Sequence, residues 1–196
     1  MSSSKDQNIE SPKGMPIEVL GMYLFIASEA ILFLALLFIF YWTKSNNPGM
    51  WPPPDQPRLP LLITGINTVI LLGSGLTMYM ARRSVMRDNT SALSRWLMIT
   101  CLLGVVFLTV QGFEWIRLIR FGLSINSSVY GAMFYIIIGL HAIHVLATAL
   151  ALLYVWVKST TNAYSAGSHR GVQMCYMFWL FVVLIWPVLY GLVYLS

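Results

Sequence analysis

The chain has 196 residues, of which 58% are hydrophobic and only 10% are charged, and its mean hydropathy is +0.72. Soluble globular domains carry about 25% charged residues, so this composition excludes a soluble domain and indicates a single domain embedded in lipid. The formal net charge of +5 does not indicate nucleic-acid binding, because the basic residues flank apolar segments and line no face of a polar domain.

Five apolar stretches follow a polar N-terminal segment, residues 1–16. Each stretch is long enough to cross a hydrocarbon core of about 30 Å as a helix. Lipid offers no partner to backbone N–H and C=O groups, so each stretch is expected to be helical. The sequence therefore predicts an all-α, polytopic membrane bundle over residues 17–195, with helices at about 17–42, 61–81, 96–116, 129–157 and 172–195.

The basic residues predict the orientation of this bundle. The side that carries the N-terminus holds eight of the 12 Lys and Arg residues, four of them in the turn from Arg82 to Arg95. Because Lys and Arg are enriched on the cytoplasmic side of membrane proteins, we expect residues 1–16 to form a cytoplasmic tail and the C-terminus to lie outside.

Aromatic residues near the ends of the apolar stretches predict the depth of the headgroups. Trp and Tyr favour the interface between hydrocarbon and water. The residues expected there are Tyr41, Trp42, Trp96, Trp115, Tyr130, Trp156 and Tyr194.

Polar residues at mid-membrane depth are the strongest functional signal. Glu29 lies near the middle of the first predicted helix, and His141 and His144 lie near the middle of the fourth. A charged side chain at the bilayer centre costs about 2.5–3.5 kcal/mol or more, so such groups turn inward and find partners. Since two histidines three residues apart share a helix face, we predict a buried hydrogen bond from Glu29 to one of them, with His144 preferred.

A metal site is the main alternative for the two histidines. A His-x-x-His pair on a helix can bind metal, but a site needs three or four ligands with further support, and the only other histidine, His169, lies in a loop. Cys101 and Cys175 are isolated thiols within apolar stretches and indicate packing. The sequence therefore predicts neither a catalytic residue nor a metal or haem ligand on this chain.

Other polar residues predict contacts between helices. Asn67 and Ser74 are seven residues apart on the second predicted helix, while Gln111 and Glu114 continue a stripe on the third that begins at Gly104. Small and polar residues in such positions join membrane helices. Pro187 is expected to kink the last helix.

Several motifs in order along the chain resemble subunit III of haem-copper respiratory oxidases, the cytochrome c oxidase subunit III family. They are LFIASEAILF on the first helix, WPPP with Leu59 and Pro60 after it, NTVILLGSGLTMYMA on the second, QGFEW on the third and GLHAIHV on the fourth. The resemblance covers about residues 17–195, and it is to the five-helix form, which lacks the first two helices of the longer members.

The resemblance implies a non-catalytic subunit of an oxygen-reducing, proton-translocating terminal oxidase. Such a subunit would flank subunit I, assemble with subunit II and other subunits, bind phospholipid in a cleft and support proton uptake. The haem and copper would belong to partner subunits. The family's carboxylate maps onto Glu29 and its paired histidines onto His141 and His144. The expected location is the bacterial inner membrane.

The last helix departs from the family pattern. Leu180 and Val183 stand where the family commonly has His and Asp. A subunit III-like protein associated with nitric oxide reductase, or a quinol oxidase subunit, is therefore an alternative. A small membrane transporter is an alternative from another class, although the chain shows no internal repeat of the kind many carriers have.

Overall fold

The structure, a computed structural model, describes residues 16–47, 51–53, 57, 59–161 and 163–195. Five α-helices are long and apolar enough to cross a membrane, the last one together with a π-helical turn. The predicted all-α, five-helix fold is thereby confirmed. The elements are α1 (Ile17–Ser45), α2 (Leu61–Val85), α3 (Thr90–Arg120), α4 (Val129–Thr160), α5 (Arg170–Leu189) and the π-helical η1 (Tyr190–Tyr194).

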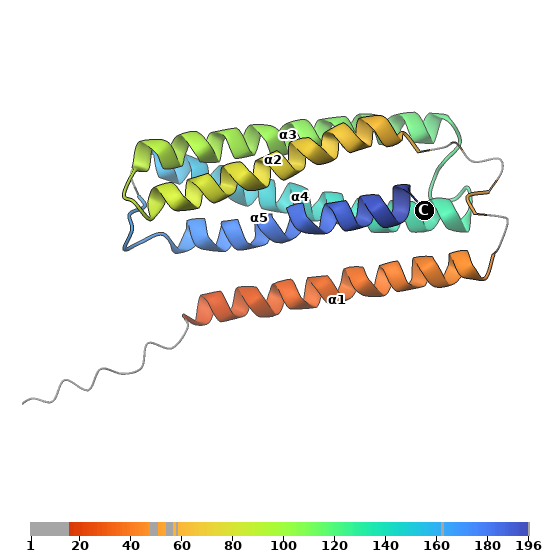
Figure 1. The fold of residues 1–196 in the computed structure, drawn as a ribbon, viewed down its shortest axis with the longest axis horizontal. Coiled ribbons are helices and arrows are strands. Elements are labelled where there is room, and N and C mark those ends of the chain that lie inside the picture. Colours follow the sequence, from red (N-terminus) through yellow and green to blue (C-terminus); the bar gives the residue numbers. More distant parts are fainter. Residues whose placement is uncertain (1–15, 48–50, 54–56, 58, 162, 196) are drawn as a thin grey trace, which may run out of the picture.

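The helices form a ring of four with one helix outside it. Contacts join α2 to α3, α3 to α4, α4 to α5 and α5 back to α2. The first helix packs against α4 and α5 only sparsely, and it runs along one side of the ring while α2 and α3 lie on the other (Figure 1). The site described below lies where α1 meets the ring.

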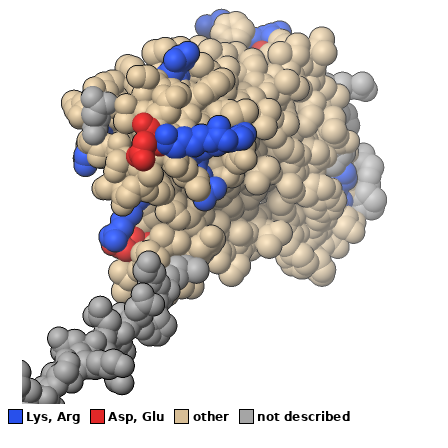
Figure 2. Space-filling model, turned by 60° about the vertical axis from the view of Figure 1, so that its left-hand side comes forward, with Lys and Arg blue, Asp and Glu red and all other residues tan. Residues whose placement is uncertain are grey.

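Each end of the bundle has a distinct set of connections. We call the end that holds the start of α1 and the α2–α3 and α4–α5 connections the basic end, and the other the opposite end. Lys and Arg side chains are spread over the basic end, with few carboxylates among them (Figure 2). The Asp88 carboxylate in the α2–α3 connection accepts a hydrogen bond from Ala166 N in the α4–α5 connection, so the two connections are tied together.

Most helices extend beyond the predicted apolar stretches. The third begins at Thr90 and ends at Arg120, where the sequence predicts about 96–116. The Asn89 side chain caps its first turn by accepting a hydrogen bond from Ala92 N at 2.9 Å. Polar and charged residues continue a helix into the headgroup layer, where water satisfies them, so hydropathy alone places the ends too early. The predicted tail, residues 1–16, lies outside the described residues except for Pro16.

The last helix changes its winding after its proline. Pro187 lies inside α5 and has no N–H to donate to the preceding turn. Two residues after it α5 ends at Leu189, and the chain continues as the π-helical turn Tyr190–Tyr194. The predicted single helix over residues 172–195 is therefore an α-helix followed by a π-helical turn.

Two residues expected at headgroup depth lie in the core. Tyr130 and Tyr194 are almost fully buried, whereas Tyr41 and Trp42 are exposed as expected. Tyr130 and Tyr194 therefore face the bundle and not the surrounding lipid, and their depth in the membrane stays a prediction. Position near a helix end does not show whether a ring faces lipid or a neighbouring helix, and these two rings face inward.

The contact between α3 and the Trp179 side chain depends on a glycine. Trp179 on α5 is fully buried, and its indole N–H donates to Ser74 Oγ on α2 at 3.2 Å. A Cβ added at Gly104 on α3 would lie 2.7 Å from Trp179 Cη2. The third helix therefore packs directly on the edge of this ring because position 104 has no side chain.

Replacement of Gly104 by alanine is expected to lower the free energy of unfolding by about 1–3 kcal/mol, the usual cost of overpacking. Gly112→Ala on the same helix is the control, since nothing lies within 4 Å of its added Cβ. Unfolding in mixed micelles of a mild detergent and SDS measures both variants. Equal effects of the two substitutions would contradict the packing described for Trp179.

Candidate functional site

A carboxylate and an imidazole join α1 to α4 at the middle of the bundle. The hydrogen bond predicted from the sequence is present, because His144 Nε2 lies 2.9 Å from Glu29 Oε2. The two side chains are 13% and 16% exposed, so the pair is mostly enclosed but not sealed. Phe33 packs edge-on against the His144 ring with centroids 5.5 Å apart.

The second ring nitrogen of His144 decides where the proton lies. His144 Nδ1 is 2.7 Å from Leu140 O, and a carbonyl oxygen only accepts, so Nδ1 carries a hydrogen. Nε2 then accepts a hydrogen bond from a protonated Glu29, or as part of an imidazolium it donates to the Glu29 carboxylate. The pair holds one shared proton and has no net charge in either form, which suits its depth in the membrane.

His141 does not join this pair. It is almost fully buried, and neither ring nitrogen has a hydrogen-bond partner among the described residues. Its ring stacks on Trp186 with centroids 4.8 Å apart and planes at 26°, and the edge of Phe107 meets it at 6.3 Å. The structure therefore places His141 in the aromatic core of the ring and His144 at the junction with α1.

Two further contacts hold the ends of α1. At the basic end, Arg170 Nη1 lies 2.9 Å from Glu18 Oε1 in an exposed ion pair. At the opposite end, Trp51 bridges two rings edge to face, with centroids 5.2 Å from both Phe40 on α1 and Tyr130 on α4. The first helix is thus attached near both of its ends as well as at its middle.

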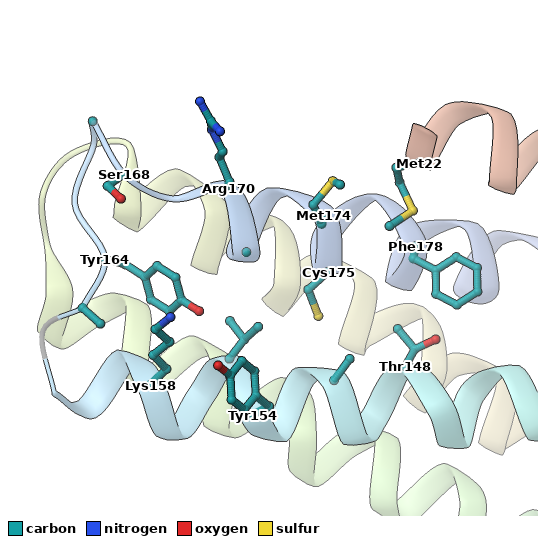
Figure 3. A pocket seen from close by; sticks show the side chains of 15 residues that line it. Met22, Thr148, Tyr154, Lys158, Tyr164, Ser168, Arg170, Met174, Cys175 and Phe178 are labelled. Carbon is teal, nitrogen blue, oxygen red and sulfur yellow. The ribbon is translucent and has the colours of Figure 1, made fainter. Parts of the chain in front are cut away.

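A cavity of about 620 Å³ lies mainly between α4, α5 and their connection, and Met22 of α1 lines its deeper end. We call it the α1 cleft. Its two ends differ in character, as Figure 3 shows: Lys158, Tyr164 and Ser168 lie toward the loop, and Met22 and Phe178 lie deeper in the membrane. The α1 cleft is therefore polar and basic where headgroups lie and apolar where acyl chains lie.

The polar end of the α1 cleft has neutral as well as charged groups. Lys158 Nζ lies 5.9 Å from the centroid of the Tyr164 ring and 6.0 Å from that of Tyr154. Burial raises the pKa of the Tyr164 phenol, and the neighbouring Tyr154 and Cys175 raise it further. The Tyr164 hydroxyl is thus a neutral hydrogen-bond donor beside an ammonium group at physiological pH.

Asn67 and Ser74 join α2 to two different neighbours. Asn67 Nδ2 donates to Phe107 O on α3 at 3.1 Å, while Ser74 accepts from the Trp179 indole on α5. Six residues nearer the opposite end than Ser74 lies Thr68, whose hydroxyl accepts from Trp186 Nε1 at 2.9 Å. The second helix therefore binds both neighbours in the ring through side-chain hydrogen bonds.

Gln111 and Glu114 are both buried on α3. Gln111 Nε2 donates to the Tyr194 hydroxyl at 3.1 Å and so holds η1 against the third helix. Glu114 has its ion-pair partner on its own helix, where Arg117 Nη1 lies 3.2 Å away. Neither residue lies in the α1 junction.

The sequence does not reveal the indole donors or the role of Tyr194. Trp179 and Trp186 are seven residues apart on α5, and their hydroxyl partners on α2, Ser74 and Thr68, are six residues apart, so each pair spans nearly two helical turns. Buried Trp N–H and Tyr O–H groups usually find partners. Within the part of the chain that the structure describes, no group of three or more His, Cys, Asp or Glu residues is placed to hold a metal ion.

Known proteins share this sequence over nearly its whole length. The family profile described as cytochrome c oxidase subunit III matches residues 6–196. The chain belongs to the cytochrome c oxidase subunit III family. The resemblance inferred from the motifs is confirmed. Subunit III is a non-catalytic subunit of the haem-copper oxidase of the respiratory chain, and an integral membrane location follows from the five spans.

Individual relatives cover most of the chain. Cytochrome c oxidase subunit 3 of Synechocystis sp. is 34% identical over 180 residues, which are 91% of this chain and 76% of the relative. The same subunit of Thermostichus vulcanus is 32% identical, with 90% of this chain and 86% of the relative covered. That of Drosophila yakuba is 35% identical, with 89% and 67% covered.

The apolar residues that depart from the subunit III pattern fill a contact between helices. Val183 is buried, and a Cβ added at Gly75 on α2 would lie 3.1 Å from Val183 Cγ1 and 3.6 Å from Leu180 Cδ2. Hydrogen bonds between α5 and α2 come from Trp179 and Trp186 instead. Position 183 is thus a packing position in this chain.

A double-mutant cycle on Glu29→Leu and His144→Leu is expected to give a coupling free energy of about 1 kcal/mol, typical of buried polar pairs in membrane proteins. Unfolding in mixed SDS micelles supplies the four free energies. The control cycle removes Glu18 and Arg170, whose side chains are 46% and 72% exposed, and is expected to give almost no coupling. A larger coupling in the control would contradict the assignment of the central pair as the main joint of α1.

Proposed function

We propose that the chain, as subunit III of a cytochrome c oxidase, contacts subunit I directly and holds a phospholipid between α1 and the ring. Through this lipid and the Glu29–His144 pair, the chain protects subunit I from inactivation during turnover and supports its proton uptake. The observation that carries the proposal is the α1 cleft, about 620 Å³ in volume, with a basic polar end and an apolar end.

The chemistry of the α1 cleft fits a phospholipid. Lys158 lines the loop end and supplies a cation for a phosphate, while the Tyr164 hydroxyl adds a neutral donor; Arg170 at the same end pairs with Glu18. Met22, Met174 and Phe178 line the deeper part, where apolar side chains favour an acyl chain. A molecule that is anionic at one end and apolar at the other matches both parts at once.

The Glu29–His144 pair supports a role in proton uptake. The pair holds a single proton between two groups whose hydrogen bond is 2.9 Å long, and both side chains retain some exposure. A shared proton at mid-membrane depth can be lost or gained when a neighbouring group or water reaches the pair. The haem and copper that use such protons belong to the partner subunits in this proposal.

The relatives support a bacterial cytoplasmic membrane as the location. Cytochrome c oxidase subunit 3 of the bacteria Synechocystis sp. and Thermostichus vulcanus is 34% and 32% identical to this chain. Eight of the 12 Lys and Arg residues on one side favour a cytoplasmic basic end, with the C-terminus outside.

Glu29→Gln separates the two roles of the central pair in the intact oxidase. Glutamine can still donate to His144 Nε2, so α1 and its lipid stay in place, but the shared proton is lost. We expect slower proton uptake and faster inactivation during turnover than in the wild-type oxidase, with unchanged lipid content by mass spectrometry. Glu29→Leu also removes the hydrogen bond and is expected to lower the lipid content.

Both variants are compared with the wild-type chain purified through an affinity tag, which is expected to bring subunits I and II with it. The proton-uptake role is wrong if Glu29→Gln leaves both proton uptake and inactivation unchanged. The lipid role is wrong if Glu29→Leu, in an assembled oxidase, retains the wild-type amount of phospholipid.

Reporter fusions test the orientation. Alkaline phosphatase folds into an active enzyme only outside the cytoplasm, so a fusion after Ser196 is expected to be active in bacterial cells. A fusion in the α4–α5 connection is expected to be inactive. The reverse pattern would place the basic end outside and contradict the proposed orientation.

A further inference from the structure

A second basic cavity lies on the other side of the ring from α1. It has a volume of about 330 Å³ and lies at the α2–α3 connection, at the same end of the bundle as the α1 cleft but lined by different residues. We call it the hairpin groove. Six residues line it: Met80, Arg83, Ser84, Arg87, Asn89 and Trp96.

The cations of the hairpin groove have no carboxylate partner among the described residues. Arg83 and Arg87 are exposed and four residues apart, at the end of α2, and the ion pairs between described residues include neither. The nearest acidic residue in sequence, Asp88, directs its carboxylate to Ala166 N. Two guanidinium groups one helical turn apart therefore repel each other until an anion lies between them.

The other two arginines near this connection, Arg82 and Arg95, do not line the hairpin groove. Arg82 lies over the Tyr176 ring at 4.9 Å and so points toward α5. Arg95 lines a different cavity, between α3 and α4. The hairpin groove therefore collects two of the four arginines of this connection, and the other two provide a matched comparison.

An exposed apolar stripe leads away from the hairpin groove along α2. Ile66, Val69, Leu76 and Met80 are all exposed and recur every three to seven residues, which places them on one helix face. Arg83 and Arg87 continue the same face. The stripe offers a path for an acyl chain directly below the two cations, and Trp96 beside them is a residue type that favours headgroup depth.

We propose that the hairpin groove binds the phosphate of an anionic phospholipid, whose acyl chain lies along the exposed face of α2. Arginine suits this ligand because its planar guanidinium donates two parallel hydrogen bonds to phosphate oxygens. Basic pockets between membrane helices bind anionic headgroups in this manner. The site is separate from the α1 cleft and does not depend on the Glu29–His144 pair.

Native mass spectrometry of the intact, tagged oxidase tests the site. Delipidated complex is titrated with phosphatidylglycerol, phosphatidylcholine or inorganic phosphate, and bound molecules are counted. The double variant Arg83→Gln, Arg87→Gln is compared with Arg82→Gln, Arg95→Gln, which removes the same charge from the same end. We expect the first variant to bind one phosphatidylglycerol fewer, or that one at least tenfold more weakly, and the second to bind as the wild type does.

Other outcomes would overturn the proposal. Equal losses in both variants would show a diffuse charge effect, and displacement of phosphatidylglycerol by inorganic phosphate would show a free-anion site. Loss of a partner subunit from the first variant, with lipid retained, would show a protein interface.

A measurement on the wild-type complex needs no variant to assemble. Phosphatidylglycerol that carries a diazirine near its glycerol is expected to cross-link, on illumination, to the peptide containing Met80–Asn89. Absence of this cross-link, when the α1 cleft is labelled, would overturn the proposal even if the double variant fails to assemble.

Discussion

Hydrocarbon offers a polar side chain no hydrogen-bond partner, and an unsatisfied group there costs several kcal/mol. In this chain that constraint selects which helices become neighbours. Asn67 reaches a backbone carbonyl of α3, and the indoles of Trp179 and Trp186 reach hydroxyl groups of α2. The apolar surfaces alone would not fix these partners, because lipid tails are as apolar as the helices. The polar side chains therefore give the ring its order.

The same constraint acts differently on α1. At mid-membrane depth this helix carries Ser28, which donates to its own backbone at Phe25 O, and Glu29, which bonds to His144 on α4. Aromatic contacts and an exposed ion pair complete the attachment, and the space between these points is left to the α1 cleft. Because the walls of the α1 cleft are polar at one end and apolar at the other, a lipid is the molecule that suits the space beside this helix. The Glu29–His144 joint and the proposed lipid site are in this sense one feature of the fold.

Sequence reasoning identifies what depends on depth and composition. The five helices follow from the lengths of the apolar stretches, and the Glu29–His144 bond follows from matching depth in two helices. The sequence predicts less well which neighbour a side chain faces. His141 and His144 are three residues apart, yet His141 stacks on Trp186 and His144 faces α1. Tyr130 and Tyr194 lie near helix ends but face inward, which hydropathy does not encode.

Connections between helices are likewise beyond a reading of the sequence. The α1 cleft depends on how the α4–α5 connection brings Tyr164 over Lys158, and the hairpin groove on how α2 and α3 place Trp96 beside two arginines. Both are products of chain path and packing. From the sequence alone, the basic residues that line these two cavities indicate only the orientation of the chain in the membrane.

The sparse attachment of α1 has a consequence for motion within the folded chain. In the most apolar 18-residue segment of α1 only 17% is buried within the protein, compared with 39% for the corresponding segment of α2. Regions with few buried contacts open locally at a free energy well below that of global unfolding. The first helix is thus the element whose local opening is expected to cost the least free energy, and such opening would leave the ring of four helices intact.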